Sequence, residues 1–237
     1  IEHPTIPILF NGNLKRLISI SFLNEYALSK YIPYSFTYDS YDYDNIEKVI
    51  KLLNYDVILK SSHRDDGVYR INRYNVDFFW NKCNDILGAG NKIIIQEYIS
   101  GTEFILTSFV NGNHIIHTPP VFTTPRYMDS QIVSNNVLVT DNRVIDSLTE
   151  CKRINEMLSN IYNITGCITC KYIVTPKFNK IISIRDNPTS SSLINIFNIM
   201  KSSFDGLVNN LLNNDFNDFN IEWSDNKSLC KMIHHNS

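Results

Sequence analysis

The sequence predicts an α+β domain with mostly antiparallel sheets, and three observations lead to this expectation. Helix-like and strand-like segments alternate along the chain, and hairpin turns join the strands more often than helical crossovers do. The 237 residues are enough for one large domain or for two lobes that share a cleft. Hydrophobic residues make up 43% and charged residues 19%, which is typical of a globular chain.

Charge and cysteine usage limit the partners and the compartment. A formal net charge of −2 provides no overall field that would attract nucleic acid or an anionic lipid surface. No apolar run approaches the roughly 20 residues that span a bilayer. The five cysteines are an odd set at irregular spacing, which argues against a disulfide framework and favours a reducing compartment. We therefore expect a cytoplasmic protein with no nucleic-acid or membrane partner.

Two helices and a strand are expected in the first 60 residues. The first helix ends near Ile32-Pro33, because proline cannot continue a helix. The second helix begins at Asp44, which has capping-box spacing to Glu47. A short strand over 56–60 follows, and a polar loop over 61–66 leads from it to Gly67-Val68.

The middle of the chain predicts a helix, a strand and a hairpin. Apolar residues at helical spacing indicate a helix over 75–87, with Gly88 and Gly90 as stop signals. A buried strand over 92–99 comes next. The strands 103–110 and 114–118 are then joined through Asn111-Gly112, the strongest short-range hairpin signal.

The last third predicts one more hairpin between helices. Residues 119–146 are rich in Pro and Thr and indicate a loop with one strand near 132–139. Ser147 and Glu150 form a capping box that opens a helix, which ends before Gly166. Two strands over 167–175 and 180–187 and an apolar helix over 191–200, which residues 201–213 could extend, complete the pattern. We expect the remaining Asn- and Asp-rich tail to be poorly packed or docked elsewhere.

The stretch from Ile95 to Glu103, Ile-Gln-Glu-Tyr-Ile-Ser-Gly-Thr-Glu, resembles the ATP-grasp superfamily. That superfamily includes carbamoyl-phosphate synthetase, biotin carboxylase and D-alanine–D-alanine ligase, and its members carry a strand that ends in an acidic-apolar hinge, followed by Gly and then Glu. Three further features follow in the family's order: strand 56–60 with Gly67-Val68, the helix before Gly166 with strand 167–175, and Asp186-Asn-Pro188. The resemblance covers residues 14–205 and implies two lobes with a nucleotide cleft between them.

The resemblance also implies roles for particular residues, with ATP as the cofactor. The hinge backbone would hold adenine, Glu103 would accept hydrogen bonds from the ribose hydroxyls, and Lys60 would neutralise phosphate charge, as would Lys15 or Arg16 on the first helix. In the family, a carboxylate substrate attacks the γ-phosphate and an amine captures the acyl phosphate. The hinge residues are Gln96, Glu97, Tyr98 and Ile99.

The chain departs from the family where magnesium is bound. Laid on the motif Glu-x-Asn-Pro-Arg, the sequence has Arg185 in place of Glu and Thr189 in place of Arg, and it keeps Asn187 as the one metal-ligand candidate. Lys171 falls near the remaining ligand. A site that holds Lys171 and Arg185 would repel Mg²⁺, which needs anionic oxygen ligands, so magnesium binding is doubtful. Lys60, Arg185 and Asn187 are the candidate catalytic residues.

Two hypotheses stay open for Lys171 and Arg185. They could replace the metal and pair directly with a triphosphate, or they could form salt bridges with Asp65, Asp66 or Glu103 in a vestigial site. Three functions follow: a degenerate nucleotide-binding domain, which we favour, an active ligase that recruits other metal ligands such as Asp186, or a structural subunit. The expected partners are a nucleotide, except for the structural subunit, which would keep the fold without the ligand, and other chains that could supply the family's N-terminal domain.

The expected organisation has four parts. Residues 1–40 form a helical entry segment, 41–98 the N-terminal lobe, 99–205 the C-terminal lobe and 206–237 a polar tail. Cys167-x-x-Cys170 suggests a zinc or redox motif. On a strand, however, the two side chains would point to opposite faces, and we expect no metal there.

Overall fold

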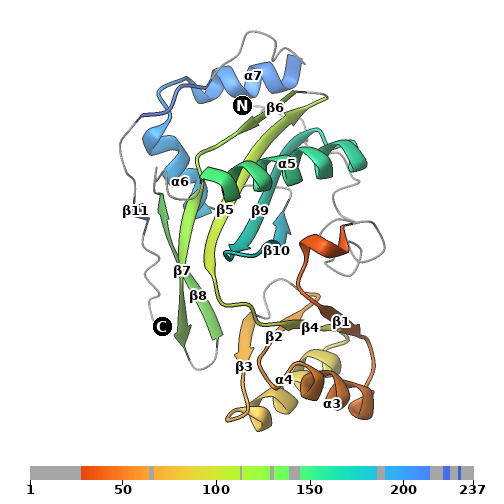
Figure 1. Cartoon of the computed structure of the whole chain (residues 1–237). Helices are drawn as coiled ribbons and strands as arrows, with labels where there is room; N and C mark the ends of the chain where they lie inside the picture. The colour runs from red at the N-terminus through yellow and green to blue at the C-terminus, as the bar shows by residue number, and fades with distance from the viewer. Residues whose placement is uncertain are drawn as a thin grey trace, which may run out of the picture. The chain divides into compact units, whose positions relative to one another are not determined.

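A computed structural model describes residues 28–63, 67–112, 114–128, 131–138, 145–185, 190–213, 221–224 and 229–230 (Figure 1). These residues divide into two compact units. Unit 2 comprises the described residues from 28 to 101 and from 124 to 135, and unit 1 comprises those from 102 to 123 and from 136 onward. The helix expected before Ile32 lies largely outside the described residues, which begin with Leu28 and a 3-10 turn, η1 (Ser29–Tyr31).

Unit 2 is built on an antiparallel sheet in the order β1–β4–β2–β3. Its strands are β1 (Ser35–Tyr38), β2 (Val57–Ser61), β3 (Val68–Ile71) and β4 (Ile93–Glu97). The central strands are rich in β-branched residues, which suit a pleated surface that is packed on one side. At the β3 edge, Tyr69 pairs with Gln131 of β8 (Gln131–Leu138).

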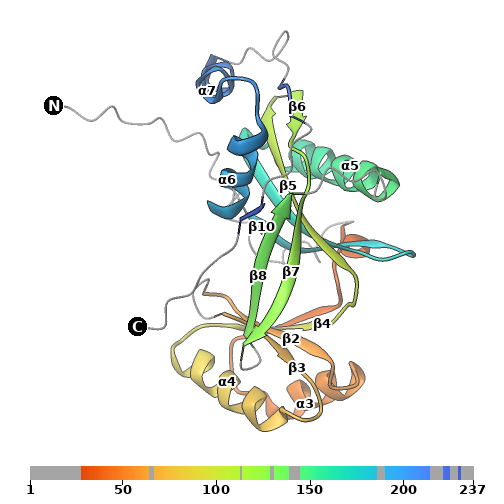
Figure 2. The same cartoon turned by 90° about the vertical axis from the view of Figure 1, so that its left-hand side faces the viewer.

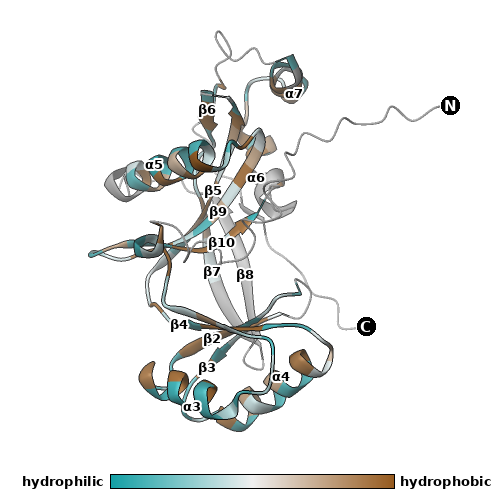
Figure 3. Ribbon diagram, turned by 90° about the vertical axis from the view of Figure 1, so that its right-hand side faces the viewer, coloured by the Kyte–Doolittle hydropathy of each residue, from teal (hydrophilic) through white to brown (hydrophobic). Residues whose placement is uncertain are grey.

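Two helices, α3 (Tyr43–Leu52) and α4 (Val76–Gly88), pack against this sheet. Hydrophobic and hydrophilic residues alternate along both helices, as one buried stripe on each requires (Figure 3). The core that they form with the sheet consists of buried aliphatic and aromatic side chains: Ile46, Val49, Ile50, Val57, Leu59, Ile71, Phe79, Cys83, Ile86, Leu87, Ile93 and Ile95. This core fixes β2 and β4, the strands that carry Lys60 and Gln96.

The start of α3 corrects the predicted capping box. The N-cap is Asp42, whose side chain accepts a hydrogen bond from the Asn45 amide at 3.4 Å, whereas Asp44 lies in the first turn. The spacing from Asp44 to Glu47 matched the pattern, but the Asp42 side chain reaches the unpaired amide first.

Substituting alanine at Asp42 is therefore expected to lower the free energy of unfolding by about 1 kcal/mol, because an amide at the helix start loses its acceptor. Asp44→Ala is the matched control, and it should cost only a few tenths of that through the helix dipole. Urea unfolding followed by circular dichroism measures both. A larger loss for Asp44→Ala would show that the helix is capped as the sequence pattern suggested.

Unit 1 is built on an antiparallel sheet in the order β7–β5–β9–β10. Its strands are β5 (Thr102–Asn111), β9 (Gly166–Val174), β10 (Asn179–Arg185) and β7 (Val121–Met128), which contributes residues to both units, as β8 does. A short strand, β6 (His114–His117), also pairs with β5, and β11 (Leu229–Cys230) pairs with β8. The β5–β6 hairpin turns at Gly112, whose φ of 56° lies in the left-handed region, so the prediction from Asn111-Gly112 is confirmed.

Helices cover both faces of this sheet (Figure 2). α5 (Ile145–Tyr162) lies on the face to which Ser108 and Tyr172 point, since its Asn155 side chain bonds to both. α6 (Ser190–Ile199) and α7 (Phe204–Asn213) cover the opposite face and pack on Ile105, Phe109 and Cys167. Cys167 and Cys170 are both buried and lie on opposite faces, as strand alternation predicted.

Three expectations about the last third of the chain are wrong. Residues 121–128 form the strand β7 where a loop was expected, α5 begins at Ile145 so that the Ser147–Glu150 box lies inside it, and residues 204–213 form a separate helix. Of the tail after residue 213, the described Ile221 lies in a core with Leu207, Leu211 and Phe109 of β5, which fits the alternative that the tail is docked. Burial against the sheet outweighs the polar composition of the surrounding sequence.

The register of β10 contains an irregularity that simple alternation does not predict. Ile181 opposes Tyr172 and Ser183 opposes Lys171, so Ile182 is an extra residue between them. Ile181 therefore shares the buried face with Ile184, whereas strict alternation from Ile184 would place Ile182 there. None of the described helices is long and apolar enough to cross a membrane.

Candidate functional site

In unit 1, Glu103 and Lys171 form an ion pair. The Lys171 Nζ lies 2.7 Å from Glu103 Oε2, and the two side chains are only 21% and 13% exposed. Glu103 opposes Ile173 across the β5–β9 pair, so Lys171 is its diagonal neighbour, within reach of a long side chain. The Thr123 hydroxyl also donates to Glu103 Oε2, at 3.2 Å. Both contacts use one carboxylate oxygen, which leaves Oε1 available to a ligand hydroxyl.

Arg185 lies on the same sheet face as Lys171. Residues that oppose each other in an antiparallel pair point to the same side, and Ser183 opposes Lys171 while Arg185 opposes Thr169. The Arg185 side chain is exposed at the end of β10. The strand register therefore places the Lys171 and Arg185 side chains on one face of the sheet. Lys171 pairs with the Glu103 carboxylate, a salt bridge that one of the two hypotheses from the sequence included.

In unit 2, Lys60 belongs to a chain of polar side chains. Its Nζ donates to Gln96 Oε1 at 2.8 Å, and Gln96 Nε2 donates to Ser35 Oγ at 3.0 Å. Gln96 is 1% exposed, and it opposes Ser35 on one neighbouring strand and Ile58 on the other. A buried amide with both ends bonded holds the ammonium group in one position.

The hinge backbone from Gln96 to Ile99 is partly committed to the fold. The Glu97 amide donates to the Tyr34 carbonyl at 2.8 Å, and the Tyr98 amide donates to the Asp56 carbonyl at 3.2 Å. No described residue accepts a hydrogen bond from the Ile99 amide. Of the Glu97, Tyr98 and Ile99 amides, that of Ile99 is therefore the one that could donate to a purine edge without breaking a described hydrogen bond.

The other two hinge side chains are tied down as well. The Glu97 carboxylate accepts a hydrogen bond from the Tyr34 amide at 3.2 Å, which pairs these two residues in both directions. The Arg70 guanidinium stacks on the Tyr98 ring at 3.7 Å from its centroid. Arg70 Nε in turn lies 3.4 Å from Asp56 Oδ1.

Several predicted site residues lie outside the described residues: Lys15, Arg16, Asp65, Asp66, Asp186 and Asn187. Their proposed roles stay predictions. Among the side chains that the structure does describe, no cluster of three or more His, Cys, Asp or Glu is arranged to hold a metal ion.

Sequence reasoning missed two residues that the structure adds to the site. Thr123, a partner of Glu103, falls in the segment that was expected to be a loop, because Pro125 and the Thr-rich composition concealed the strand β7. Ser35, the partner of Gln96, belongs to a strand whose pairing with β4 spans about 60 residues of sequence. Its position as a small polar residue between Tyr34 and Phe36 was the only signal in the sequence.

Comparison with curated proteins finds phosphoribosylamine–glycine ligases. The protein from Methanococcus vannielii is 25% identical over 159 residues, and that from Clostridium acetobutylicum is 25% identical over 156 residues. These alignments cover 61% and 60% of this chain but only 36% and 37% of the relatives, so the chain matches little more than a third of their length. No protein-family model matches the chain.

Solved structures of ATP-grasp enzymes share the fold. A phosphoribosylamine–glycine ligase from Thermotoga maritima superposes with a TM-score of 0.64 at 14% identity, covering 82% of this chain and 52% of its own. An N5-carboxyaminoimidazole synthetase from Staphylococcus aureus, complexed with ADP, gives 0.62 at 14% identity over 82% and 50%. A D-alanine–D-alanine ligase from Bacillus anthracis, complexed with ATP, gives 0.55 at 13% over 73% and 55%. The chain therefore has the ATP-grasp fold of the carboxylate–amine ligases, which confirms the superfamily resemblance and the α+β class.

Proposed function

We propose that this chain binds an adenine nucleotide through fixed cationic side chains and that it is not an efficient ligase. The observation that carries the proposal is the position of Lys171, held at 2.7 Å by Glu103 on the same sheet face as Arg185. The relatives are ligases, and two of the neighbouring structures hold ADP and ATP, which supports a nucleotide as the ligand.

In unit 1, Glu103 is a candidate contact for a ribose hydroxyl, and Lys171 and Arg185 are candidate contacts for phosphate. The free Oε1 of Glu103 is an acceptor for a ribose hydroxyl, while Lys171 holds the other oxygen. Arg185 offers a planar set of donors that can bind a phosphate at two oxygens. A phosphate that approaches Lys171 would share its ammonium group with Glu103, so nucleotide affinity should be modest.

In unit 2, considered by itself, the Ile99 amide and the Lys60 ammonium group are candidate contacts for a purine and for a phosphate. The Ile99 amide, for which the described part of the chain offers no acceptor, can donate to a purine nitrogen, and the Lys60 ammonium, held by Gln96, is a point charge for a phosphate oxygen. Because Lys60 is already ordered, binding would cost less side-chain entropy than it would at a mobile lysine.

Catalysis is expected to be weak because phosphoryl transfer depends on charge neutralisation at the transferred group. In the family, divalent ions do most of this, and they require anionic oxygen ligands. Arg185 stands where the family motif has Glu. Ammonium and guanidinium groups neutralise a triphosphate through hydrogen bonds, but each carries a single charge and neither coordinates a phosphate oxygen directly as a divalent ion does.

The Glu103–Lys171 pair also supports a second candidate, a structural subunit that keeps the fold without the ligand. In that case the pair only compensates charge within unit 1, and the function of the chain would be to bind other protein chains in an assembly. An active ligase like the phosphoribosylamine–glycine ligases is the remaining alternative.

A thermal-shift experiment separates the three functions. With ATP in excess EDTA, the melting temperature should rise as much as it does with ATP and Mg²⁺, because binding that needs no metal stabilises the fold equally in both buffers. A shift that appears only with Mg²⁺ would support the ligase, and no shift in either buffer would support the structural subunit.

The Arg185→Glu variant sharpens this test, since it restores the family's acidic residue. Its shift should require Mg²⁺, because the new carboxylate repels a bare triphosphate but can bind a metal ion. Lys177→Glu is the matched control: it makes the same change of charge on an exposed residue in the β9–β10 turn and should leave the ATP response unchanged. If Arg185→Glu gains no metal dependence, Arg185 has been placed wrongly.

A further inference from the structure

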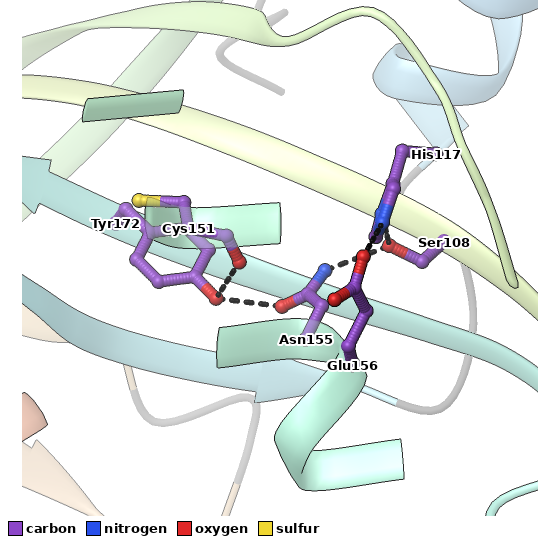
Figure 4. Close-up of polar contacts among 6 residues, drawn as sticks. All are labelled: Ser108, His117, Cys151, Asn155, Glu156 and Tyr172. Carbon is purple, nitrogen blue, oxygen red and sulfur yellow. Dashed lines mark hydrogen bonds and ion pairs between the residues drawn. The ribbon is translucent and has the colours of Figure 1, made fainter. Parts of the chain in front are cut away.

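A continuous chain of hydrogen bonds links β5, β6 and α5 on the face of unit 1 that α5 covers (Figure 4). Ser108 Oγ lies 2.8 Å from His117 Nδ1, and His117 Nε2 lies 3.1 Å from Glu156 Oε1. The Asn155 side chain donates to Ser108 Oγ at 2.8 Å. His117 thus contacts a strand on one side and a helix on the other.

The donors and acceptors in this series of hydrogen bonds can be assigned by starting from its buried end, at Tyr172. The one proton of the Tyr172 hydroxyl faces two acceptors, Asn155 Oδ1 at 2.6 Å and the Cys151 carbonyl at 3.1 Å. The shorter contact is to Asn155 Oδ1, so the Asn155 amide nitrogen is the donor to Ser108. With that bond accepted, the Ser108 hydroxyl proton is directed at His117 Nδ1. A ring nitrogen that accepts carries no proton, so neutral His117 holds its proton on Nε2 and donates it to Glu156.

The order Ser108, His117, Glu156 is that of a nucleophile, a base and an orienting acid, but the geometry excludes that role. Ser108 is 0% exposed, so no substrate reaches its hydroxyl. Its oxygen also accepts a hydrogen bond from Asn155, which lowers its nucleophilicity. The array therefore acts on the structure of unit 1 rather than on a substrate.

The surroundings of His117 favour its neutral form. The pKa of His117 is lowered, mainly because burial disfavours the cation, while Glu156 opposes this shift and Lys152 adds to it. Glu156 and Lys152 are the charged groups that α5 presents. From β5 only the uncharged Ser108 reaches the ring, and from β9 the phenol of Tyr172 connects through Asn155.

We propose that His117 is a pH-sensitive latch that fastens β6 and α5 to β5 and opens when the imidazole is protonated. The second proton goes to Nδ1, so His117 stops accepting from Ser108 and becomes a donor toward it. The Ser108 hydroxyl proton then loses its acceptor in a place that water does not reach. β6 has four residues and pairs only with β5 among the described strands, so we expect β6 to separate from β5 before any other strand opens.

The pH window follows from the direction of the shift. Because the pKa in the folded chain lies below the ordinary value of 6.5, the unfolded or opened form binds the proton more readily. The stabilisation is complete above pH 6.5 and is lost as the pH falls toward the folded pKa. Within that window the opening constant of β6 should rise as the pH falls, by at most about tenfold for each pH unit, because one proton is bound.

Hydrogen exchange of the full chain, corrected for intrinsic rates, measures this opening at the β6 amides. The expected result is a loss of β6 protection on acidification, with β2 and β4 of unit 2 unaffected. His117→Gln keeps an acceptor and a donor without a titratable group, so its β6 protection should not depend on pH. His114→Gln on the same strand is the control, because His114 is exposed, and it should behave like the wild type.

NMR of the wild-type imidazole ring provides a test that needs no variant. The predicted result is an Nε2–H tautomer at neutral pH and a midpoint below 6.5, which Glu156→Gln should lower further by removing the favourable charge. An Nδ1–H tautomer, a midpoint at or above 6.5, or pH-dependent β6 exchange that persists in His117→Gln would overturn the latch.

Discussion

Replacing Lys171 with methionine is expected to lower the free energy of unfolding of unit 1 by about 2–3 kcal/mol, the largest single loss that we predict. Methionine keeps most of the aliphatic stem but leaves Glu103, 13% exposed, with an uncompensated charge. The estimate lies below the range for fully buried pairs, because the Lys171 side chain is 21% exposed and solvent screens part of the interaction. Urea unfolding of the whole chain measures the change.

A double-mutant cycle with Glu103→Gln separates the ion pair from packing. Glu103→Gln removes the charge and keeps an acceptor for Thr123, so Lys171→Met should cost much less in that background. The double variant should recover more than half of the lost stability. If Lys171→Met costs the same in both backgrounds, the ion pair contributes nothing and Lys171 matters only through its stem.

Replacing Lys60 with methionine is expected to weaken ATP binding by about 10- to 100-fold, the value of a charge-assisted hydrogen bond to phosphate. The Lys60 ammonium is held by Gln96, so it is positioned before a ligand arrives. Isothermal titration with ATP in EDTA measures the loss. The substitution also removes the donor to the buried Gln96 oxygen, so stability must be measured in parallel.

Lys51→Met is the matched control for Lys60. Lys51 is also a lysine of unit 2, but its ammonium group pairs with Glu47 on the outside of α3, and about half of its side chain is exposed. Its loss should leave ATP affinity within about twofold, since an exposed pair contributes little. Equal ATP affinities for Lys51→Met and Lys60→Met would remove Lys60 from the site.

Features of the fold that one or two neighbouring residues determine could be predicted from the sequence. The hairpin near Asn111-Gly112 was predicted because this dipeptide favours a tight turn, and the chain does turn at Gly112, whose φ is positive. The alternation of buried and polar residues along β9 placed Lys171 opposite the buried Tyr172, and the structure agrees. In both cases the determinant lies within a few residues of the feature.

Features that depend on distant pairing could not be read in the same way. The contact between Lys171 and Glu103 depends on the register of β5 against β9, which only the folded sheet defines. The extra residue at Ile182 changes which side chains of β10 are buried, and no local signal marks it. The Ser35–Gln96–Lys60 chain likewise joins three strands that are separate in sequence.

The two faces of the β5–β9 pair carry different chemistry. One face bears the Glu103–Lys171 pair, and the other bears the Ser108 and Tyr172 hydroxyls that lead to His117. Nucleotide binding and the pH-sensitive latch are thus assigned to opposite sides of the same strands. Each can be tested without the other, because Lys171→Met leaves the residues of the latch in place, and His117→Gln leaves the cations in place.

A crystal structure of the chain with ATP and Mn²⁺, in which anomalous scattering locates the metal, would show whether cationic side chains or a metal ion hold the phosphates. We expect Arg185 or Lys171 to lie within hydrogen-bond distance of a phosphate oxygen, about 2.7–3.2 Å, and no side chain of this protein to coordinate manganese. Manganese bound to carboxylate or amide side chains beside the phosphates, or a triphosphate that touches neither cation, would contradict this expectation.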